Sequence, residues 1–402
     1  MERITPQTEA ELSDAVRDAA LNRLCFEIVS GGTKRSYGRV TEADRLLDLS
    51  HFSGMQTYEP DELIFTARAA TPIAEIEATL SARRQMLAFA PADWGPLFGE
   101  KSGSATLAGV AAANACGSRR FKSGAVRDHL IGCRFVNGDG EAIKAGGRVV
   151  KNVTGFDLPK LLCGAFGTLG ALTEMTFRVV PALSRAPAIA IRDCHADEGL
   201  SLLRKAAGLP FEATGLAYLP AQLCALSTAL HAAHLSQANG LALIRIEGAE
   251  DPVIDKIARL RDIFSKQNLT VLEDDVTAAL FAEIGNGTPF RQHNSDIWRL
   301  FVPSTRAYEA LAESEASFWY ADWAGEVLWL GLPASREVEE RLRKITAKFG
   351  GSAMLMRAGA QARSRLSVFE PEPPARAALT RAVKTAFDPM HLFNPGRMYE
   401  DV

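Results

Sequence analysis

Glycine runs in the first half of the chain constrain the fold more than any other feature. The first, Ser30-Gly31-Gly32-Thr33-Lys34, follows the short apolar run at residues 25–30. Consecutive glycines let a backbone turn sharply and bring several N–H groups close to an anion, and Lys34 adds a positive charge. The pattern predicts a strand that runs into a phosphate-binding loop. The run has neither Walker A spacing nor Gly-x-Gly-x-x-Gly, so it gives no support for a P-loop or a Rossmann NAD site.

Two further glycine-rich segments follow. The second contains Ser102-Gly103-Ser104-Ala105-Thr106-Leu107-Ala108-Gly109, then Asn114-Ala115-Cys116-Gly117-Ser118 and Gly124-Ala125-Val126-Arg127-Asp128. The third contains Lys151-Asn152-Val153-Thr154-Gly155-Phe156-Asp157 and runs on through residues 164–174. Glycine and alanine allow close backbone approach to a flat ligand, and hydroxyl and amide side chains can bond its polar edge. These segments favour a site for a redox ring.

The predicted pattern of secondary structure changes after Pro181. Before it, short strands alternate with turns, and Asn137-Gly138-Asp139-Gly140 predicts a β-hairpin. After it, helices alternate with strands, among them a helix at residues 336–349, which predicts a second, α+β domain. Residues 374–387 form an amphipathic helical pattern, and the prolines beyond it predict an extended tail that packs back on the protein.

Composition excludes several classes of protein. The 402 residues are enough for two or three domains, and a net charge of −3 gives no reason to expect nucleic-acid binding. The N-terminus turns polar at once, unlike a secretory signal, and the most apolar windows are shorter than the roughly 20 residues that cross a bilayer. We expect a cytoplasmic protein without direct membrane insertion, associated with a membrane only through partner subunits.

The six cysteines contain no Cys-x-x-Cys pair. Iron–sulfur clusters and structural zinc need thiolates at short spacings, so we expect no bound metal and mostly buried, free thiols. His231 and His234 share a helical spacing, but no third ligand lies nearby in the sequence, and a surface pair is the better interpretation.

Taken together, the glycine-rich segments resemble a known family. In this order and at these separations they are similar to the FAD-binding domain of the vanillyl-alcohol oxidase and p-cresol methylhydroxylase (PCMH) type. Within it they resemble the branch of glycolate oxidase and D-lactate dehydrogenase, and especially the FAD-binding E subunits of glycolate oxidase. The run Phe393-Asn394-Pro395-Gly396-Arg397 extends the similarity to the C-terminus. The resemblance implies an α+β fold, with a two-subdomain PCMH-type domain at residues 1–181, an α+β cap domain at 182–372, and a helix and tail at 373–402 that return to the FAD domain.

The resemblance also implies a set of FAD-binding residues. The first loop would wrap the diphosphate, and the later segments would line the diphosphate, ribityl and isoalloxazine regions and the adenine end. The residues assigned in this way are Ser30, Gly31, Gly32, Thr33, Lys34, Gly38, Thr106, Gly109, Asn114, Gly117, Ser118, Gly124 and Leu172. Ser30 stands where a third glycine is more usual, which would cost about 1 kcal/mol or more if its φ were positive. The first loop has no histidine, and His129 has the pattern of a structural residue, so we expect non-covalent FAD.

The sequence contains few candidate residues for the oxidation of a 2-hydroxy acid. The related catalytic subunits carry His-x-Gly-Asp-Gly-Asn-x-His in the cap domain, and nothing here matches it. Arg291 and His293 are the only cap-domain candidates for a substrate cation and a base. A solvated polar loop is the favoured interpretation of both.

The resemblance therefore predicts the FAD-binding subunit of a multi-subunit glycolate oxidase. It would work beside a catalytic flavoprotein subunit and an iron–sulfur subunit and would relay electrons between them. Two alternatives stay open. The chain could be a complete dehydrogenase of another 2-hydroxy acid, or a structural subunit whose FAD only stabilises the fold.

Overall fold

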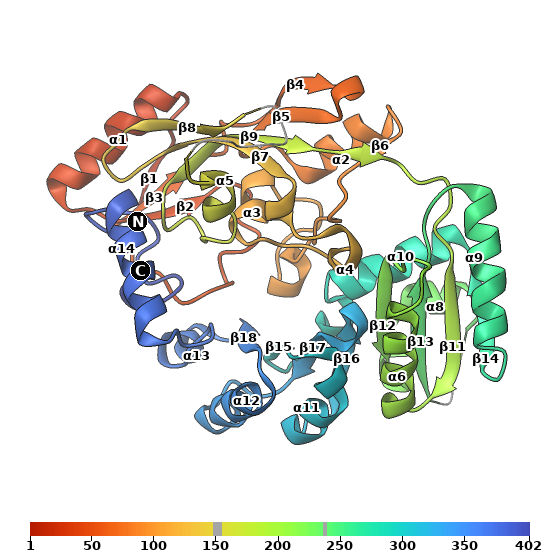
Figure 1. Ribbon diagram of the computed structural model, residues 1–402. Coiled ribbons are helices and arrows are strands. Elements are labelled where there is room, and N and C mark those ends of the chain that lie inside the picture. The colour runs from red at the N-terminus through yellow and green to blue at the C-terminus, as the bar shows by residue number, and fades with distance from the viewer. Residues whose placement is uncertain (148–154, 236–238) are drawn as a thin grey trace. The chain divides into compact units, whose positions relative to one another are not determined.

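A computed structural model describes residues 1–147, 155–235 and 239–402 of the chain. The residues of the third motif from Lys151 to Thr154 lie outside this part. The chain forms two compact units (Figure 1). Unit 1 comprises Met1–Cys116, Ala125–Ala182 and Arg363–Val402, and unit 2 comprises Gly117–Gly124 and Leu183–Ala362.

A three-stranded parallel sheet in the order β1-β3-β2 forms the first layer of unit 1. Its strands are β1 (Glu2–Ile4), β2 (Phe26–Val29) and β3 (Arg45–Asp48). Helix α1 (Glu9–Asn22) is capped by the Thr8 side chain and buries Leu12 and Val16 in the same hydrophobic cluster as Phe26. The predicted strand that precedes the glycine loop is thus confirmed as β2.

A five-stranded antiparallel sheet in the order β4-β5-β9-β7-β8 forms the second layer of unit 1. Its strands are β4 (Met55–Glu59), β5 (Ile64–Arg68), β7 (Leu130–Val136), β8 (Ala142–Gly146) and β9 (Ala171–Arg178). Strands β7 and β8 pair across the predicted Asn137–Gly140 turn, which confirms the hairpin. A short two-stranded sheet joins β6 (Gln85–Met86) to β10 (Val180–Pro181).

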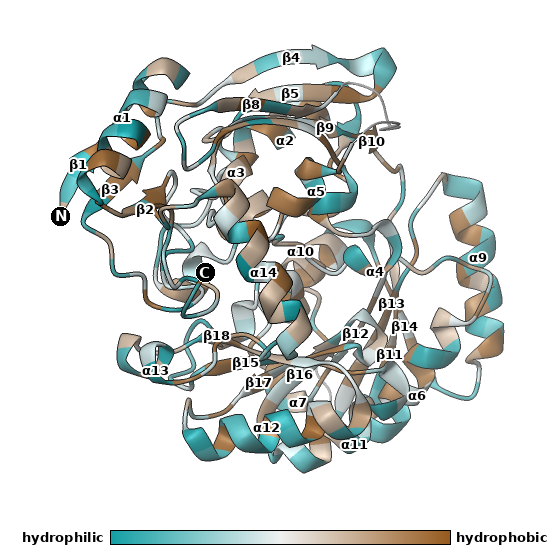
Figure 2. Cartoon of the chain, turned by 60° about the vertical axis from the view of Figure 1, so that its left-hand side comes forward, coloured by the Kyte–Doolittle hydropathy of each residue, from teal (hydrophilic) through white to brown (hydrophobic). Residues whose placement is uncertain are grey.

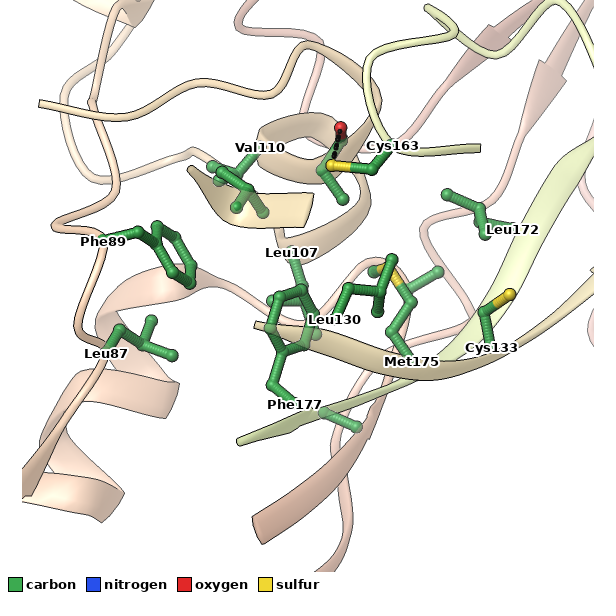
Figure 3. Packing of buried hydrophobic residues seen from close by; sticks show 14 of the residues in the cluster. Leu87, Phe89, Leu107, Val110, Leu130, Cys133, Cys163, Leu172, Met175 and Phe177 are labelled. Atoms are coloured by element: carbon green, nitrogen blue, oxygen red, sulfur yellow. Dashed lines mark hydrogen bonds between the residues drawn. The ribbon is translucent and has the colours of Figure 1, made fainter. Parts of the chain in front are cut away.

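Helices α2 and α3 pack on this second layer. Figure 3 shows the cluster, in which Leu107 and Val110 of α3 lie with Leu130, Met175 and Phe177 of strands β7 and β9. The dashed line in the figure joins the Cys163 thiol to the Ala111 carbonyl oxygen, 3.2 Å apart. The helices and their bounds are α2 (Ile73–Ser81), α3 (Leu107–Ala112), α5 (Leu158–Leu162) and α14 (Pro374–Phe387).

An eight-stranded antiparallel sheet in the order β14-β11-β13-β12-β16-β17-β15-β18 forms the core of unit 2. Its strands are β11 (Ala188–Cys194), β12 (Gly215–Leu219), β13 (Gly240–Arg245), β14 (Asn268–Leu272), β15 (Ile297–Phe301), β16 (Phe318–Asp322), β17 (Val327–Gly331) and β18 (Ser352–Arg357). In Figure 2 these strands are mostly brown, while α9 and α12 carry both teal and brown residues, as amphipathic helices do.

Helices cover this sheet, and the longer ones contact its strands directly: α6 contacts β12 and β13, α9 contacts β11, and α12 contacts β15 and β18. The predicted helix at residues 336–349 is confirmed as α12. The helices are α4 (Arg120–Ser123), α6 (Ala196–Ala207), α7 (Ala221–Cys224), α8 (Thr228–Ala232), α9 (Glu250–Ile263), α10 (Asp274–Gly285), α11 (Ala307–Ser314) and α12 (Arg336–Phe349). Helix α13 (Ala360–Arg365) begins in unit 2 and ends in unit 1.

The C-terminal tail returns to unit 1. Helix α14 has the bounds predicted from the sequence, and beyond it Phe393 forms a parallel bridge with Phe26 of β2. The compact units differ from the sequence-based domains in three places, of which the smallest is Ala182, the last residue of a unit 1 segment. Residues 117–124 belong to unit 2 although unit 1 flanks them in sequence, and residues 363–372 belong to unit 1. These segments are short, so composition alone gives no signal of which unit they pack on.

Candidate functional site

A cavity of about 810 Å³, part of it open to solvent, lies in unit 1 beside the end of β2. One part of the lining is apolar and another carries lysine, arginine and hydroxyl groups. The lining residues are Ile28, Val29, Ser30, Gly32, Thr33, Lys34, Arg35, Tyr37, Leu49, Ala69, Thr106, Ala108, Gly109, Ala112, Ala113, Phe166, Gly167, Gly170, Leu172, Asn394 and Arg397.

Close packing joins the first glycine loop to the second glycine-rich segment. A Cβ atom at Gly31 would lie 2.2 Å from the Ser104 carbonyl oxygen, so only glycine fits there. The Ser30 hydroxyl lies 2.8 Å from the Thr106 hydroxyl, and either can donate the hydrogen bond between them. Gly32 has a φ of 69°, the left-handed region in which other residues are strained. Ser30 is not among the residues with positive φ, so it does not carry the strain considered from the sequence.

The loop offers unused backbone donors. Within the described part of the chain, the N–H groups of Gly32, Thr33, Lys34 and Ser36 have no hydrogen-bond acceptor. Buried or half-buried N–H groups are almost always bonded in folded proteins, so a run of free ones beside a cavity indicates a ligand that accepts hydrogen bonds. Successive free N–H groups form a concavity suited to an anion. This arrangement fits the diphosphate of FAD.

Lys34 supplies the positive charge at this loop. Its ammonium lies 3.4 Å from the Thr33 hydroxyl, and burial lowers the pKa of Lys34 to about 8, with the Asp93 carboxylate acting in the opposite direction. Near neutral pH Lys34 therefore still carries its positive charge, and it loses this charge when the pH rises above about 8.

The C-terminal tail contributes two residues to the cavity that the sequence-based site did not include. The Asn394 side chain accepts a hydrogen bond from the Ile28 N–H at 2.9 Å and donates one to the Phe166 carbonyl at 2.8 Å. Arg397 is buried, and its guanidinium donates to the Arg35 carbonyl at 2.6 Å. The tail thereby joins the end of β2 to the segment that begins at Phe166. The Asn-Pro-Gly-Arg run was visible in the sequence, but only as part of the resemblance.

Seven of the residues assigned to FAD line this cavity and six do not. Those that line it are Ser30, Gly32, Thr33, Lys34, Thr106, Gly109 and Leu172. Gly31, Gly38 and Asn114 lie in unit 1 outside the lining, and Gly117, Ser118 and Gly124 belong to unit 2.

Two of these six residues have hydrogen-bond partners within their own unit. Asn114 has a φ of 46°, and its side-chain oxygen accepts a hydrogen bond from the Arg127 N–H at 3.4 Å. Ser118 is buried in unit 2 and donates a hydrogen bond of 2.6 Å to Asp322. Burial raises the pKa of Asp322 to about 6, against the opposing hydrogen bonds from Ser118 and the Trp323 N–H.

The two candidate substrate residues are placed differently from each other. Arg291 is exposed at the end of a short turn. His293 is half-buried, its ring stacks on Phe318 with centroids 3.8 Å apart, and its Nδ1 lies 2.7 Å from the Ser295 hydroxyl. These contacts give His293 a structural role within unit 2, and no described contact joins it to Arg291.

Two other features are absent from the described residues. No group of three or more His, Cys, Asp or Glu side chains that could hold a metal ion is found there. Nor does any described helix have the length and apolar character needed to span a membrane. The cysteines are free, and all but the half-buried Cys25 are buried.

Comparisons with known proteins agree with the geometry of unit 1. Residues 3–146 match the model of the FAD binding domain family. The chain is 30% identical over 393 residues to glycolate oxidase subunit GlcE of Escherichia coli K12, and the match covers 97% of each protein. It is 28% identical over 189 residues to D-lactate dehydrogenase of Archaeoglobus fulgidus, covering 47% of this chain and 40% of that protein.

A solved structure supports the fold independently. The crystal structure of p-cresol methylhydroxylase with substrate bound superposes with a TM-score of 0.75 at 14% identity, covering 98% of this chain and 88% of that one. The predicted α+β fold of PCMH type and the choice of FAD as cofactor are confirmed. This chain therefore belongs to the family of FAD-binding oxidoreductases that includes subunit GlcE of glycolate oxidase.

Proposed function

We propose that this chain is the FAD-binding subunit of a multi-subunit oxidase that converts glycolate, a 2-hydroxy acid, to glyoxylate. The observation that carries the proposal is the full-length similarity to subunit GlcE. Subunit GlcD of the glycolate oxidase of Bacillus subtilis is also similar, at 28% identity over 44% of this chain. Two differently named subunits of glycolate oxidases, from two different bacteria, thus resemble this chain, which supports assembly with a related flavoprotein. An iron–sulfur subunit would complete the complex.

The FAD diphosphate would bind the free N–H groups of the first loop. Thr33 and Lys34 would add a hydroxyl donor and a positive charge, and the apolar part of the cavity, with Leu49 and Leu172, would hold an uncharged part of the cofactor. A bound flavin accepts two electrons and can release them one at a time. The contribution of the protein is to hold the cofactor by its phosphates and to exclude water from the apolar part.

The substrate chemistry belongs to the partner flavoprotein. Oxidation of a 2-hydroxy acid needs a base for the hydroxyl and a cation for the carboxylate. His293 is occupied by Ser295 and Phe318, Arg291 lies in solvent, and the sequence has no His-x-Gly-Asp-Gly-Asn-x-His run. These observations favour an electron-transfer role for the flavin of this chain over substrate oxidation.

Turnover with and without partners tests this function. The purified chain with FAD should give little glyoxylate from glycolate with an artificial electron acceptor, and addition of the catalytic flavoprotein and iron–sulfur subunits should restore turnover. Robust turnover by the chain alone would instead support a complete dehydrogenase. Full activity of a complex whose copy of this chain is flavin-free would show that its FAD only stabilises the fold.

Non-covalent attachment of the flavin gives a simple prediction. The first loop contains no histidine, and no histidine lines the cavity described in unit 1. Acid precipitation of the purified holoprotein should therefore release essentially all of the flavin into the supernatant, measured by its absorbance. Flavin that stays with the pellet through washing would contradict this and would direct attention to His129.

The lowered pKa of Lys34 predicts how FAD binding depends on pH. In the free protein this pKa is about 8, and a bound diphosphate should raise it. The affinity for FAD should then be constant below pH 8. Above pH 8 it should fall by up to about tenfold per pH unit, until the pH reaches the raised pKa of Lys34 in the FAD complex. Titration of the flavin-free protein with FAD at several pH values measures this dependence.

Lys34→Arg is the matched variant for that titration. An arginine keeps its charge throughout the range, so the profile should become flat above pH 8. Any effect from titration of the flavin itself would persist in the variant. Parallel pH profiles in the two proteins would show that Lys34 does not face the diphosphate.

A further inference from the structure

We infer that Arg397, thirteen residues beyond buried Lys384 in the C-terminal region, is a positioning residue that shapes the diphosphate loop. The inference rests on the proposed FAD site and goes beyond it, because it assigns to the C-terminal tail a part in cofactor binding. Arg397 is 6% exposed and lies against the loop rather than in solvent.

The guanidinium of Arg397 is surrounded by loop carbonyls. Its Nη1 lies 2.6 Å from the carbonyl oxygen of Arg35, 3.5 Å from that of Tyr37 and 3.4 Å from that of Arg39. The main chain adds another contact, because the Arg39 N–H donates to the Arg397 carbonyl at 2.9 Å. Arg363 holds the intervening Gly38 carbonyl at 3.0 Å. Arg363 and Arg397 therefore bind four of the five backbone carbonyls of residues 35–39. The exception is the carbonyl of Ser36.

This arrangement fixes the direction of one of the free loop N–H groups. In a trans peptide the C=O and the N–H of the following residue point in opposite directions. The carbonyl of Arg35 points to Arg397, so the N–H of Ser36 points away from it, and this N–H is one of the free donors of the loop. Arg397 thus fixes the orientation of the Arg35–Ser36 peptide, directly after Lys34 and Arg35, which line the cavity.

Glu27 holds the guanidinium in place. Its Oε1 accepts hydrogen bonds from Nη2 of Arg397 at 3.1 Å and from Nε of Arg35 at 3.0 Å. Burial by itself raises the pKa of Glu27, but the hydrogen bonds and charges of Arg35 and Arg397 more than offset this and lower it. Glu27 is thus a buried carboxylate that joins the two arginines and does not line the cavity.

The same contact explains Gly38. A Cβ atom there would lie 2.8 Å from Cδ of Arg397, and its φ is 95°. Gly38 does not line the cavity, so a glycine here is explained by its positive φ and by the approach of Arg397.

The test compares Arg397→Lys, Glu27→Gln and, as a control, Arg381→Gln. Arg381 belongs to the same C-terminal segment, but its ion pair with Asp401 is exposed. Dissociation constants for FAD would be measured on flavin-free protein at a temperature at which circular dichroism shows each variant folded. Arg397→Lys should weaken FAD binding by about tenfold or more, since an ammonium cannot bind several carbonyls in the geometry of a guanidinium. Arg381→Gln should bind like wild type.

Glu27→Gln separates positioning from direct charge attraction. A positioning role predicts weaker FAD binding in this variant too, because Arg397 loses the carboxylate that holds its guanidinium against the loop carbonyls. If Arg397 acted by its charge on the diphosphate, removal of a neighbouring carboxylate would leave binding equal or tighter, and the inference would be overturned. Unchanged binding in both variants would also overturn it. If Arg397→Lys does not fold, Glu27→Gln alone decides. Failure of the wild-type chain to bind FAD would instead refute the proposed function.

Discussion

Gly31→Val is expected to leave the purified protein almost free of flavin. Even a Cβ atom at this position would lie 2.2 Å from the Ser104 carbonyl oxygen and 2.9 Å from Cγ2 of Thr106, so the loop must move away from the second segment. Overpacking of this kind costs about 1–3 kcal/mol, and each lost hydrogen bond to a charged group costs about 1.5–3 kcal/mol. Because 1.4 kcal/mol is a factor of ten, FAD affinity should fall by about a hundredfold or more.

Gly32→Val should have a smaller effect than Gly31→Val. A Cβ atom at Gly32 would meet its nearest neighbour, Cγ2 of Val29, at 3.6 Å, so there is room for it. The cost comes from the positive φ and amounts to about 1–2 kcal/mol, or roughly tenfold in affinity. Gly147→Ala is the control, since a Cβ there has no neighbour within 4 Å.

Flavin content and the shift of melting temperature on addition of FAD would be measured for the three variants and wild type. Bound FAD stabilises the folded state by mass action, so the shift should be large in wild type and Gly147→Ala and smallest in Gly31→Val. Equal flavin occupancy in all four proteins would mean that the loop is an ordinary turn and that FAD binds elsewhere.

Lys384→Met is expected to cause the largest loss of stability. The Lys384 ammonium is fully buried and bonds to three acceptors: the Asp388 carboxylate at 2.7 Å, the Thr168 carbonyl at 2.7 Å and the Phe393 carbonyl at 3.0 Å. Burial lowers the pKa of Lys384, with Asp388 acting in the opposite direction. Removal of the cation leaves a buried carboxylate without its partner, at a cost of about 3–5 kcal/mol.

Thermal unfolding of the flavin-free proteins measures this loss. The melting temperature of Lys384→Met should fall by roughly 6–20 °C for a unit of this size. Lys160→Met is the matched control, because it breaks an exposed pair with Asp157 and should cost at most about 1 kcal/mol. Similar melting temperatures for the two variants would show that the buried pair contributes little to the docking of the tail.

Local signals in the sequence were sufficient for much of the fold. The Asn137–Gly140 turn and helix α14 depend on residues that are close in sequence, and both formed as predicted. The first glycine loop could be predicted for the same reason, because consecutive glycines favour a sharp turn in any surroundings.

Features that depend on distant segments could not be predicted in this way. Lys384 has the pattern of an exposed residue on an amphipathic helix, yet it is buried, and one of its acceptors, the Thr168 carbonyl, lies 216 residues away in sequence. Arg397 meets Glu27 across 370 residues of sequence. Asn114 and Ser118 belong to one stretch of the resemblance, yet the chain passes from unit 1 to unit 2 between them. Both sides of this crossing are rich in glycine and small residues, so composition does not reveal where the chain leaves unit 1.

Hydrogen exchange of the loop amides tests the central claim most directly. Exchange would be followed by mass spectrometry in the flavin-free chain before and after addition of FAD, with resolution over residues 30–38. The free N–H groups of Gly32, Thr33, Lys34 and Ser36 should exchange quickly without FAD and become strongly protected with one equivalent bound. If FAD binds tightly and protects other segments while this loop exchanges as before, the diphosphate is not held by the loop and the account of the site is wrong.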